Sequence, residues 1–535
     1  MSPRCFAPCG FLSLAFYPSL SLSGDSIQES DSYRRGEQIY QSVCIACHQA
    51  DGKGIEGAFP PLAQSDFLRE YRDRSIRAVL FGLSGEIRVN GVRYFAAMPD
   101  PDLSDQQAAD VMTYVMNAWG NRDAPVSLQQ VQSIRQGATR SPDPYPELPD
   151  APEGFELSEF ARLPENCVRL ASDPKSGSLY VLALSGNIYR FEAGSRVPTL
   201  EVERSAYIDS QTARDQALGF LIDSKRRMYV ILNQLIEGAP WQMSLVTIYR
   251  SNLLDSSGRP GALKPWFRTS YPFGNGGLTH GVSGMAQGLD GQLYINSGSR
   301  TDSAEVADNP LWWPGAETET TACIWRMDPE SDQPSVEVFA KGIRNAWSLC
   351  FSPDGDLLMV DNGPRIPAPE ELNHIEEGKH YGFPYEFGKM RAIDHYSHGK
   401  AIPEGLELSR PIPNTGPAAG GSESQPILSF DPHSSPAGFI YCDASFPPAL
   451  RGKYLIGRFG SLFQGFTAGF DILLATIERN KEGQYTSTME TFLSPLSRPL
   501  DIHQAAGRVY ILEYGRQSAF GESRKGPGRI IELSW

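Results

Sequence analysis

A hairpin pattern recurs six times in the later, larger part of the chain, and it constrains the fold more than any other sequence feature. Each copy has an apolar segment, a turn containing Asp, Gly or Lys, and a second apolar segment that is usually centred on an aromatic residue. The copies cover residues 168–181, 219–230, 284–295, 348–360, 438–456 and 499–511. Repeated hairpins of this kind are typical of β-propellers. We therefore predict a mainly β fold, a six-bladed β-propeller over residues 155–535, with long loops on one face.

A second feature lies nearer the N-terminus, where the sequence VCIACHQ places Cys44 and Cys47 directly before His48. Two cysteines at this spacing can form a redox pair, half of a zinc site or an attachment point for haem. No cysteine follows until Cys167 and no histidine until His280, so a zinc site cannot be completed locally. A redox pair does not need the adjacent histidine. The motif therefore predicts covalent haem c, with the imidazole as an axial iron ligand.

The residues around this motif predict a small all-α domain. Residues 33–40 have the spacing of an amphipathic helix that leads into the motif. Residues 103–119 begin with a capping pattern, Ser104 and Gln107, and continue with apolar residues that share one face. Such a domain would wrap around the haem.

A haem that transfers electrons takes a second axial ligand from the protein, and a thioether raises its potential. The candidates are Met98, Met112 and Met116. The last two lie on the apolar face of the predicted helix, where a methionine is more often part of the core. Met98 lies in the loop before that helix, so we predict His48 and Met98 as the two iron ligands.

Residues 31–122 resemble class I cytochrome c. The resemblance depends on Cys44, Cys47, His48, Pro60-Pro61, Met98-Pro99 and the closing pattern Tyr114-x-x-x-x-Trp119-Gly120. It implies a periplasmic or secreted protein, because haem is attached to such proteins outside the cytoplasm. Residues 1–30 have the order of a secretory leader, although two prolines interrupt them and no Ala-x-Ala site follows.

The composition limits the partners and marks a boundary. The formal net charge of -15 argues against nucleic acid or an anionic membrane surface as a partner. No apolar run reaches the roughly 18 residues that a membrane span needs. Residues 123–154 turn polar and then Pro-rich, which predicts an extended linker between the two domains.

Two loops of the predicted propeller carry unusual residues, and propellers bind ligands over the central channel. One loop contains His280 and directly precedes the third hairpin. The other follows the fourth hairpin and begins Asp361-Asn362-Gly363-Pro364, while Gly342-Ile343-Arg344-Asn345 lies just before that hairpin. Together they would place a titratable base, a guanidinium and a carbonyl-rich turn on one rim.

These residues resemble the glucose/sorbosone dehydrogenase family, from about residue 155 to the C-terminus. The motifs that carry the resemblance are His280, Asp290-Gly291-Gln292-Leu293-Tyr294, Gly298-Ser299-Arg300-Thr301-Asp302, Gly342-x-Arg344-Asn345, Asp361-Asn362-Gly363, Pro369-Glu370-Glu371-Leu372-Asn373, Tyr381-Gly382-Phe383-Pro384, His433-Ser434-Ser435-Pro436-Ala437-Gly438 and Arg498-Pro499. Members of the family are propeller enzymes that use pyrroloquinoline quinone.

The resemblance implies roles for individual residues. His280 would be the general base, with Asp302 as a candidate to orient it. Arg344 and Asn345 would hold quinone oxygens or carboxylates, and the carbonyls of Gly363 and Pro364 would ligate Ca²⁺. A cofactor with three carboxylates also needs cations, for which Arg344, Arg458 and Arg498 are the candidates.

One motif departs from the family. Where relatives have Gly-Ser-Trp-Asn-Arg, this chain has Gly460-Ser461-Leu462-Phe463-Gln464, so a tryptophan and an arginine are missing. We expect Arg458 to supply the missing charge from two residues before the motif.

The combined expectation is a quinoprotein dehydrogenase that oxidises a sugar or similar alcohol by hydride transfer to the quinone and passes electrons through haem c to an external acceptor. Two alternatives come from other classes of protein. A propeller with Ca²⁺ over its channel could be a lactonase-type hydrolase, which would need carboxylate and Asn ligands around the metal. It could also be a quinone-free binding module that carries an electron-transfer cytochrome.

Overall fold

A computed structural model of the chain describes residues 27–28, 30–55, 59–83, 87–94, 98, 101, 103–137, 148–209, 215–238, 240–274, 279–305, 311–418, 429–462, 468–514 and 528–535. The chain divides into two compact units, Met1–Pro142 and Asp143–Trp535. The predicted leader lies almost wholly outside the described residues, as do the Pro-rich residues 138–147 of the predicted linker.

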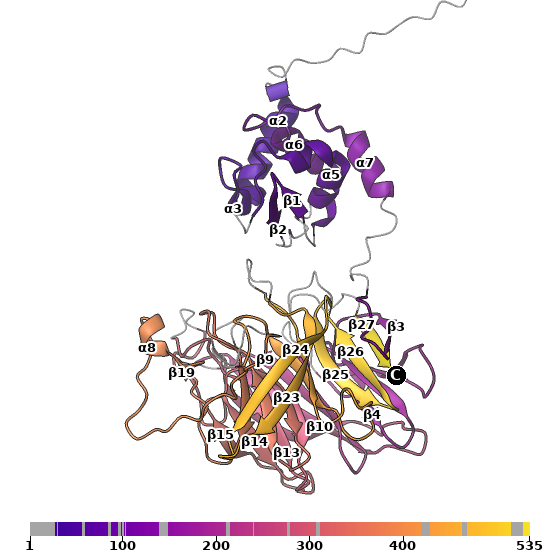
Figure 1. Ribbon diagram of the computed structural model, residues 1–535, viewed down its shortest axis with the longest axis vertical. Helices are drawn as coiled ribbons and strands as arrows, with labels where there is room; N and C mark the ends of the chain where they lie inside the picture. The colour runs from indigo at the N-terminus through magenta and orange to yellow at the C-terminus, as the bar shows by residue number, and fades with distance from the viewer. Residues whose placement is uncertain are drawn as a thin grey trace, which may run out of the picture. The chain divides into compact units, whose positions relative to one another are not determined.

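The first unit is mainly helical (Figure 1). Its elements are α2 (Asp31–Ile39), a π-helical turn (Tyr40–Cys44), α3 (Ile45–His48), α4 (Asp66–Glu70), α5 (Arg72–Phe81), β1 (Ile87–Val89), β2 (Val92–Tyr94), α6 (Asp105–Val115) and α7 (Leu128–Gly137). The predicted capping box at the start of α6 is present, because the Ser104 and Gln107 side chains each bond to the other residue's main chain. The small hairpin of β1 and β2 was not expected from the sequence.

Helices α2 and α6 pack closely where Gly36 faces Asp110. A Cβ atom at Gly36 would collide with the Asp110 carbonyl, so only glycine allows this approach. Helix α7 covers part of the same core with Val131, which is fully buried. The expectation of an extended linker from residue 123 was therefore wrong for residues 128–137, whose apolar side chains at helical spacing pack against α5 and α6.

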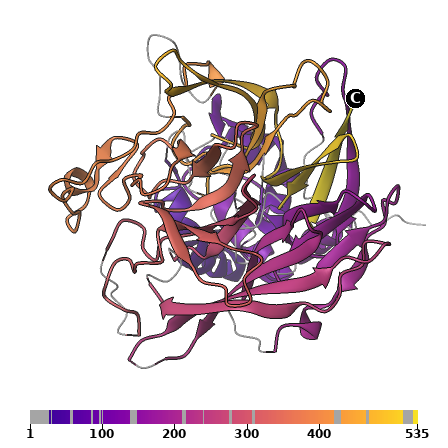
Figure 2. The ribbon, with the colours of Figure 1, turned by 90° about the horizontal axis from the view of Figure 1, so that it is seen from below.

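The second unit is a six-bladed β-propeller, as predicted (Figure 2). Its first three sheets are β4 (Cys167–Asp173), β5 (Ser178–Ala183), β6 (Ile188–Phe191) and β7 (Thr199–Val202); β8 (Gln216–Ile222), β9 (Arg227–Ile236), β10 (Met243–Leu253) and β11 (Lys264–Pro272); and β12 (Val282–Gln287), β13 (Leu293–Ser297), β14 (Cys323–Met327) and β15 (Glu337–Lys341). The other three are β16 (Ala346–Phe351), β17 (Leu357–Asp361) and β18 (Glu371–Ile375); β21 (Pro436–Tyr441), β22 (Tyr454–Arg458), β23 (Asp471–Arg479) and β24 (Tyr485–Leu493); and β25 (Pro499–Ala505), β26 (Arg508–Glu513), β27 (Gly528–Ser534) and β3 (Glu156–Leu163).

The six predicted hairpins are the two innermost strands of the six blades. The last blade closes the ring, because its outer strand β3 comes from the start of the unit and pairs with β27 near the C-terminus. Strands β3 and β27 lie side by side in Figure 1. Between the fourth and fifth blades the chain forms two short strands, β19 (Glu386–Phe387) and β20 (Met390–Arg391), and a helical turn, α8 (Ala392–His395).

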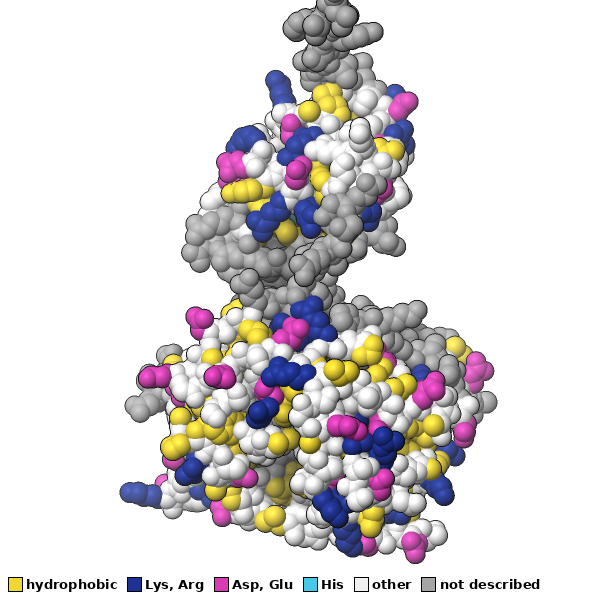
Figure 3. Space-filling view, turned by 90° about the vertical axis from the view of Figure 1, so that its right-hand side faces the viewer, with side chains coloured by type: hydrophobic (Ala, Val, Ile, Leu, Met, Phe, Trp, Pro, Cys, Tyr) yellow, Lys and Arg dark blue, Asp and Glu magenta, His cyan; other side chains and the backbone are white. Residues whose placement is uncertain are grey.

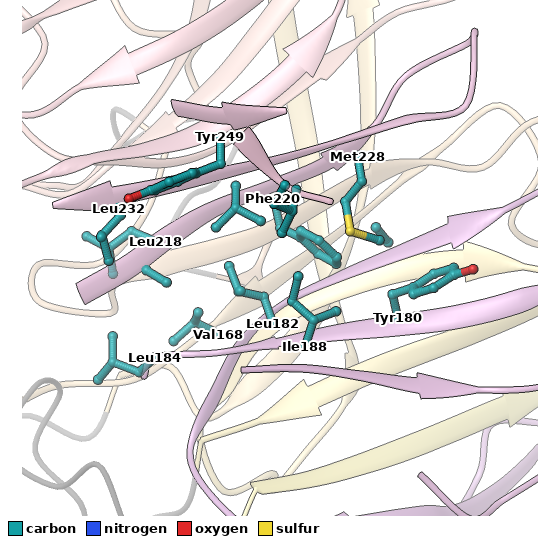
Figure 4. Close-up of a cluster of buried hydrophobic side chains, with 14 of the residues drawn as sticks. Val168, Tyr180, Leu182, Leu184, Ile188, Leu218, Phe220, Met228, Leu232 and Tyr249 are labelled. Atoms are coloured by element: carbon teal, nitrogen blue, oxygen red, sulfur yellow. The ribbon is translucent and has the colours of Figure 1, made fainter. Parts of the chain in front are cut away.

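Apolar side chains fill the space between neighbouring blades. Residues of the first and second sheets meet in one buried cluster that includes Val168, Leu182, Leu218, Phe220 and Leu232 (Figure 4). Burial of each such side chain contributes roughly 1.5–3 kcal/mol. This packing fixes the blades and hence the loops at their ends.

The centre of the ring is crossed by a buried cation. Arg169 of β4 donates from Nε to the Leu218 carbonyl on β8 at 2.9 Å and from Nη2 to the Trp347 carbonyl on β16 at 2.6 Å. Its guanidinium also lies 4.1 Å from the centre of the Trp347 ring. Three inner strands are thus joined across the axis of the propeller.

The described surface mixes charges of both signs. Acidic and basic side chains are interspersed over the face shown in Figure 3. No helix in the described part of the chain is long and apolar enough to cross a membrane.

Candidate active site

The haem motif lies on one short helical segment. Cys44 ends the π-helical turn, and Cys47 and His48 belong to α3. Both cysteines are free, half-buried thiols. Nδ1 of His48 lies 3.0 Å from the Pro60 carbonyl, which can only accept a hydrogen bond, so Nδ1 carries the proton and Nε2 keeps its lone pair. Burial lowers the pKa of His48 and keeps the ring neutral. These residues fit a covalent haem with an imidazole ligand.

The three candidate methionines differ in their surroundings. Met112 lies on α6 and is almost fully buried in the hydrophobic core of the first unit. The sulfur of Met116 accepts a hydrogen bond from Nη1 of Arg72 at 3.1 Å. Met98 is half-buried and is held by two main-chain hydrogen bonds with Leu83, at 2.8 and 2.9 Å. The packing of the other two thioethers favours Met98, whose role as an iron ligand stays a prediction.

The predicted propeller residues share one edge of the ring. In an antiparallel hairpin, the start of the first strand and the end of the second lie at the same edge. His280 and Arg344 precede the inner strands β12 and β16, while Ser299 and Asn362 follow β13 and β17. The strand register therefore brings residues from distant parts of the sequence to one rim.

Arg344 is held firmly on this rim, and the residue is 5% exposed. Its Nη2 donates to Oδ1 of Asp302 at 2.6 Å, and its Nε donates to the Asp302 carbonyl at 3.1 Å. Nη1 donates to the Asn362 carbonyl at 3.0 Å. These bonds use three of the five guanidinium N–H groups, and no described residue accepts from the other two, which could bind a ligand.

Asp361 shapes the turn that carries Arg344 and Asn345. Its carboxylate accepts from the main-chain N–H of Arg344 at 2.9 Å and of Asn345 at 2.6 Å. Burial raises the pKa of Asp361 to about 6. The side-chain amide of Asn345 has no hydrogen-bond partner among the described residues, and Oδ1 of Asn362 is buried without one. The rim thus presents polar atoms that no described residue hydrogen-bonds.

The predicted Ca²⁺ ligands lie in the adjacent turn. The Gly363 N–H donates to the carboxylate of Glu370, which is buried. Within the described ranges, no hydrogen bond reaches the carbonyls of Gly363 and Pro364. Two carbonyl oxygens without donors beside a buried carboxylate fit a hard cation such as Ca²⁺. The described residues contain no group of three or more His, Cys, Asp or Glu side chains placed to hold a metal.

His280 lies half-buried between the loops before β12 and after β13. Its Nδ1 lies 3.1 Å from Oγ of Ser299, and its main-chain N–H donates to the Ser299 carbonyl at 2.7 Å. Burial, together with the charge of Arg344, lowers the pKa of His280 well below its ordinary value. The ring is therefore neutral near pH 7 and can accept a proton.

The expectation that Asp302 orients His280 is not met by the geometry. The Asp302 carboxylate instead bonds Arg344, the main-chain N–H of Arg365 at 3.2 Å and the Tyr396 hydroxyl at 3.4 Å. The nearby guanidinium attracts it more strongly than a neutral imidazole could. Instead, Oγ of Ser299 lies at hydrogen-bond distance from the His280 imidazole, a contact that the sequence did not single out.

Arg458 does not provide a free charge. Its Nε and Nη2 form a two-pronged contact with Asp471 at 2.8 and 2.6 Å, and its Nη1 pairs with Asp431 at 2.9 Å. Two carboxylates already balance this cation, which argues against its use for a cofactor carboxylate. Phe463 and Gln464 of the departing motif lie outside the described residues.

Arg498 has a different environment. Its guanidinium donates to the carbonyls of Gly460 and Ser461 at 3.3 Å and lies over the rings of Phe459 and Phe470. These contacts hold it at the rim before β25, and it remains a candidate to bind an anion.

His433 was quoted in the sequence motif without a role. Burial and the charge of Arg344 lower its pKa, whereas Asp302 raises it, so its ring lies in the field of that ion pair. Its backbone has a positive φ of 60°, which is uncommon for a residue other than glycine. Ser429 and Ser435 of the same segment also have positive φ angles. Strain of this kind often accompanies a functional site.

A cavity of about 730 Å³ lies apart from this rim. It is lined by Gly355 and Asp356 in the turn between β16 and β17, at the end of that hairpin opposite to Arg344. None of the predicted site residues lines it. We therefore assign the chemistry to the rim and not to this cavity.

The fold and the site define a haem-binding cytochrome unit joined to a propeller whose rim carries anchored guanidinium groups and a neutral imidazole. A family model for cytochrome c matches residues 33–119, and a family model for glucose/sorbosone dehydrogenase matches residues 224–514. The chain therefore belongs to the glucose/sorbosone dehydrogenase family and carries a cytochrome c domain. Both resemblances predicted from the sequence are confirmed.

Individual relatives cover one unit or the other. Cytochrome c-552 of Thermus thermophilus is 34% identical over 126 residues, which are 22% of this chain and 82% of that protein. The fructose dehydrogenase cytochrome subunit of Gluconobacter japonicus is 31% identical over 112 residues, 20% of this chain and 23% of the subunit. Among solved structures, the PQQ-bound aldose sugar dehydrogenase of Streptomyces coelicolor is 19% identical with a TM-score of 0.46, over 72% of this chain and 99% of that one.

Proposed function

We propose that the protein is a quinoprotein dehydrogenase that oxidises a sugar or a similar alcohol and delivers the electrons to an external acceptor through its cytochrome unit. The observation that carries the proposal is the rim where neutral His280 lies near the anchored Arg344. A proton acceptor beside a fixed cation suits oxidation of a hydroxyl carbon with an anionic cofactor.

The oxidation removes two electrons and two protons from a CH–OH group. Bound pyrroloquinoline quinone would supply the acceptor for the hydride, which accounts for both electrons and one hydrogen. His280 takes the hydroxyl proton. Because its pKa is lowered, it releases that proton readily to solvent and is ready for the next substrate.

The residues that would hold the cofactors follow from the unused polar atoms of the rim. Among the described residues, Arg344 and Asn345 keep N–H groups that no protein atom accepts and that could bind quinone oxygens or carboxylates; Arg498, held by the Gly460 carbonyl, is a further cation at the same edge. The Gly363 and Pro364 carbonyls would bind Ca²⁺. Haem c on Cys44, Cys47 and His48 would supply one-electron transfer.

The names of the cytochrome relatives support the combination of a cytochrome with a sugar or alcohol dehydrogenase. They include the fructose dehydrogenase cytochrome subunit of Gluconobacter japonicus and the cytochrome c subunit of alcohol dehydrogenase (quinone) of Gluconobacter oxydans. In those proteins a similar cytochrome belongs to a sugar or alcohol dehydrogenase. We also propose a periplasmic or secreted location, where haem c is attached and sugars are accessible.

The test is reconstitution of the purified haem protein with pyrroloquinoline quinone and Ca²⁺, followed by a panel of aldoses, sorbosone and simple alcohols. We expect at least one substrate to reduce the haem, as followed by its absorption band, and a His280→Gln variant to lose this reduction. A protein that binds the quinone but reduces its haem with none of these substrates would overturn the proposal. A lactonase would instead hydrolyse a lactone without any change of the haem spectrum.

A further inference from the structure

Ser299 links the proton acceptor of the proposed reaction to a carbonyl in the same loop. Its side chain is fully buried directly after β13. Oγ of Ser299 lies 2.7 Å from the Thr301 carbonyl and 3.1 Å from Nδ1 of His280. The hydroxyl therefore has two partners at hydrogen-bond distance.

A count of protons assigns the direction of both bonds. A serine hydroxyl has one hydrogen, and a carbonyl can only accept. The shorter contact to Thr301 therefore takes the Ser299 hydrogen. Towards His280 the oxygen can then only accept, so Nδ1 of the imidazole carries a proton.

The main chain holds the same residues in place. The His280 N–H donates to the Ser299 carbonyl at 2.7 Å, and the Ser299 N–H donates to the Arg344 carbonyl at 2.7 Å. Oγ1 of Thr301 donates to the half-buried carboxylate of Glu317 at 2.8 Å. The serine is thus fixed between the base and the loop that carries the guanidinium.

We infer that Ser299 is a positioning residue that holds His280 in the Nδ1–H tautomer and leaves Nε2 as the atom that accepts the substrate proton. The catalytic meaning of this inference rests on the proposed function, but the tautomer itself does not. Because Ser299 is neutral, it adds no negative charge next to His280. A carboxylate in the same position would stabilise the protonated imidazole.

The tautomer can be measured without turnover. Nitrogen NMR of protein with labelled histidine, with the haem reduced, distinguishes a protonated from an unprotonated ring nitrogen. The His280 signals are identified by their loss in His280→Gln. We expect a protonated Nδ1 in the natural protein and in Ser299→Thr, and a mixture of tautomers or an Nε2–H form in Ser299→Ala.

Ser297→Ala is the matched control, because Ser297 is equally buried and its hydroxyl also donates to a carbonyl, that of Thr320 at 2.7 Å, and not to His280. It should leave the His280 signals unchanged. A natural protein with Nε2–H, or a Ser299→Ala variant with unchanged His280 signals, would overturn the inference.

Kinetics give a second readout. Since a positioned general base contributes at least about 100-fold, we expect Ser299→Ala to lower kcat by roughly 10- to 100-fold with little change in KM, and Ser299→Thr to restore most of it. If no substrate reduces the haem of the natural protein, the proposed function fails, while the NMR result still decides the tautomer.

Discussion

Arg344 and Asp302 form an ion pair that is almost fully excluded from solvent, with 2.6 Å between Nη2 and Oδ1 and side chains that are 6% and 5% exposed. The pair joins the loop after β13 to the loop before β16. It fixes the guanidinium on the rim, and it explains why the aspartate does not serve His280.

Asp302→Asn should destabilise the propeller strongly. The change leaves the buried Arg344 charge without its partner, which typically costs about 3–5 kcal/mol. Chemical denaturation followed by circular dichroism measures the loss. Asp394→Asn is the matched control, because Asp394 pairs with Arg391 on the surface, where both side chains are about half exposed. Equal stability of the two variants would contradict a structural role for the buried pair.

Substitution of the methionines should identify the second iron ligand. Met98→Ala should abolish the red absorption band that a thioether–iron bond gives to the oxidised haem and should lower the reduction potential. Met112→Leu and Met116→Leu should keep the band, because one side chain is part of the helix core and the other accepts from Arg72. Loss of the band in either leucine variant would remove Met98 from this role.

The propeller could be predicted because its inner hairpins are local in sequence. In five of the six, a turn of only a few residues joins two apolar strands, so the pattern is visible in a short window; the fifth, β21 and β22, has a longer connection over residues 442–453. The closing pair of β27 and β3 joins opposite ends of the unit, from Gly528 to Leu163, and no local pattern indicates it. The α7 helix was missed because its few apolar residues follow a polar stretch.

The site was predictable as a set of loops but not as a set of contacts. The Arg344 and His280 motifs carry the family resemblance, and the strand register brings them to one edge. Which carboxylate meets which cation depends on side-chain directions across loops of different blades. The sequence therefore could not show that Asp302 pairs with Arg344, that Ser299 meets His280 or that Asp471 neutralises Arg458.

Glu371 should make the stability of the propeller fall as the pH rises from its ordinary pKa towards about 8. Burial, with the neighbouring Asp361 and Glu370, raises the pKa of its carboxyl to about 8. The folded protein therefore keeps a proton that the unfolded chain has lost, so stability is highest below the unfolded pKa and is lost as pH rises through about 8. Between about pH 6.5 and 8.5 this amounts to about 2 kcal/mol.

The measurement is the unfolding free energy across that pH range in the presence of a chelator. The range lies above the ordinary histidine pKa, so the histidines with lowered pKa values add little to the slope. Glu371→Gln should flatten the profile, whereas Glu490→Gln, at an exposed position of β24, should not. A natural protein whose stability is constant over this range would contradict the raised pKa.

Gly298→Ala should reduce turnover by displacing the base. A Cβ atom at Gly298 would lie 2.5 Å from Cβ of His280 and 3.0 Å from the Gly281 carbonyl, so the histidine must move. A shift of about 1 Å at a reacting group can cost about 100-fold in rate. We expect kcat for haem reduction to fall at least about tenfold while the circular dichroism spectrum and the covalent haem content stay the same.

Gly261→Ala is the control, since the atom nearest to a Cβ at Gly261 would be Cβ of Asn252 at an ordinary 3.4 Å. Normal turnover in Gly298→Ala would show that the position of His280 does not limit the reaction.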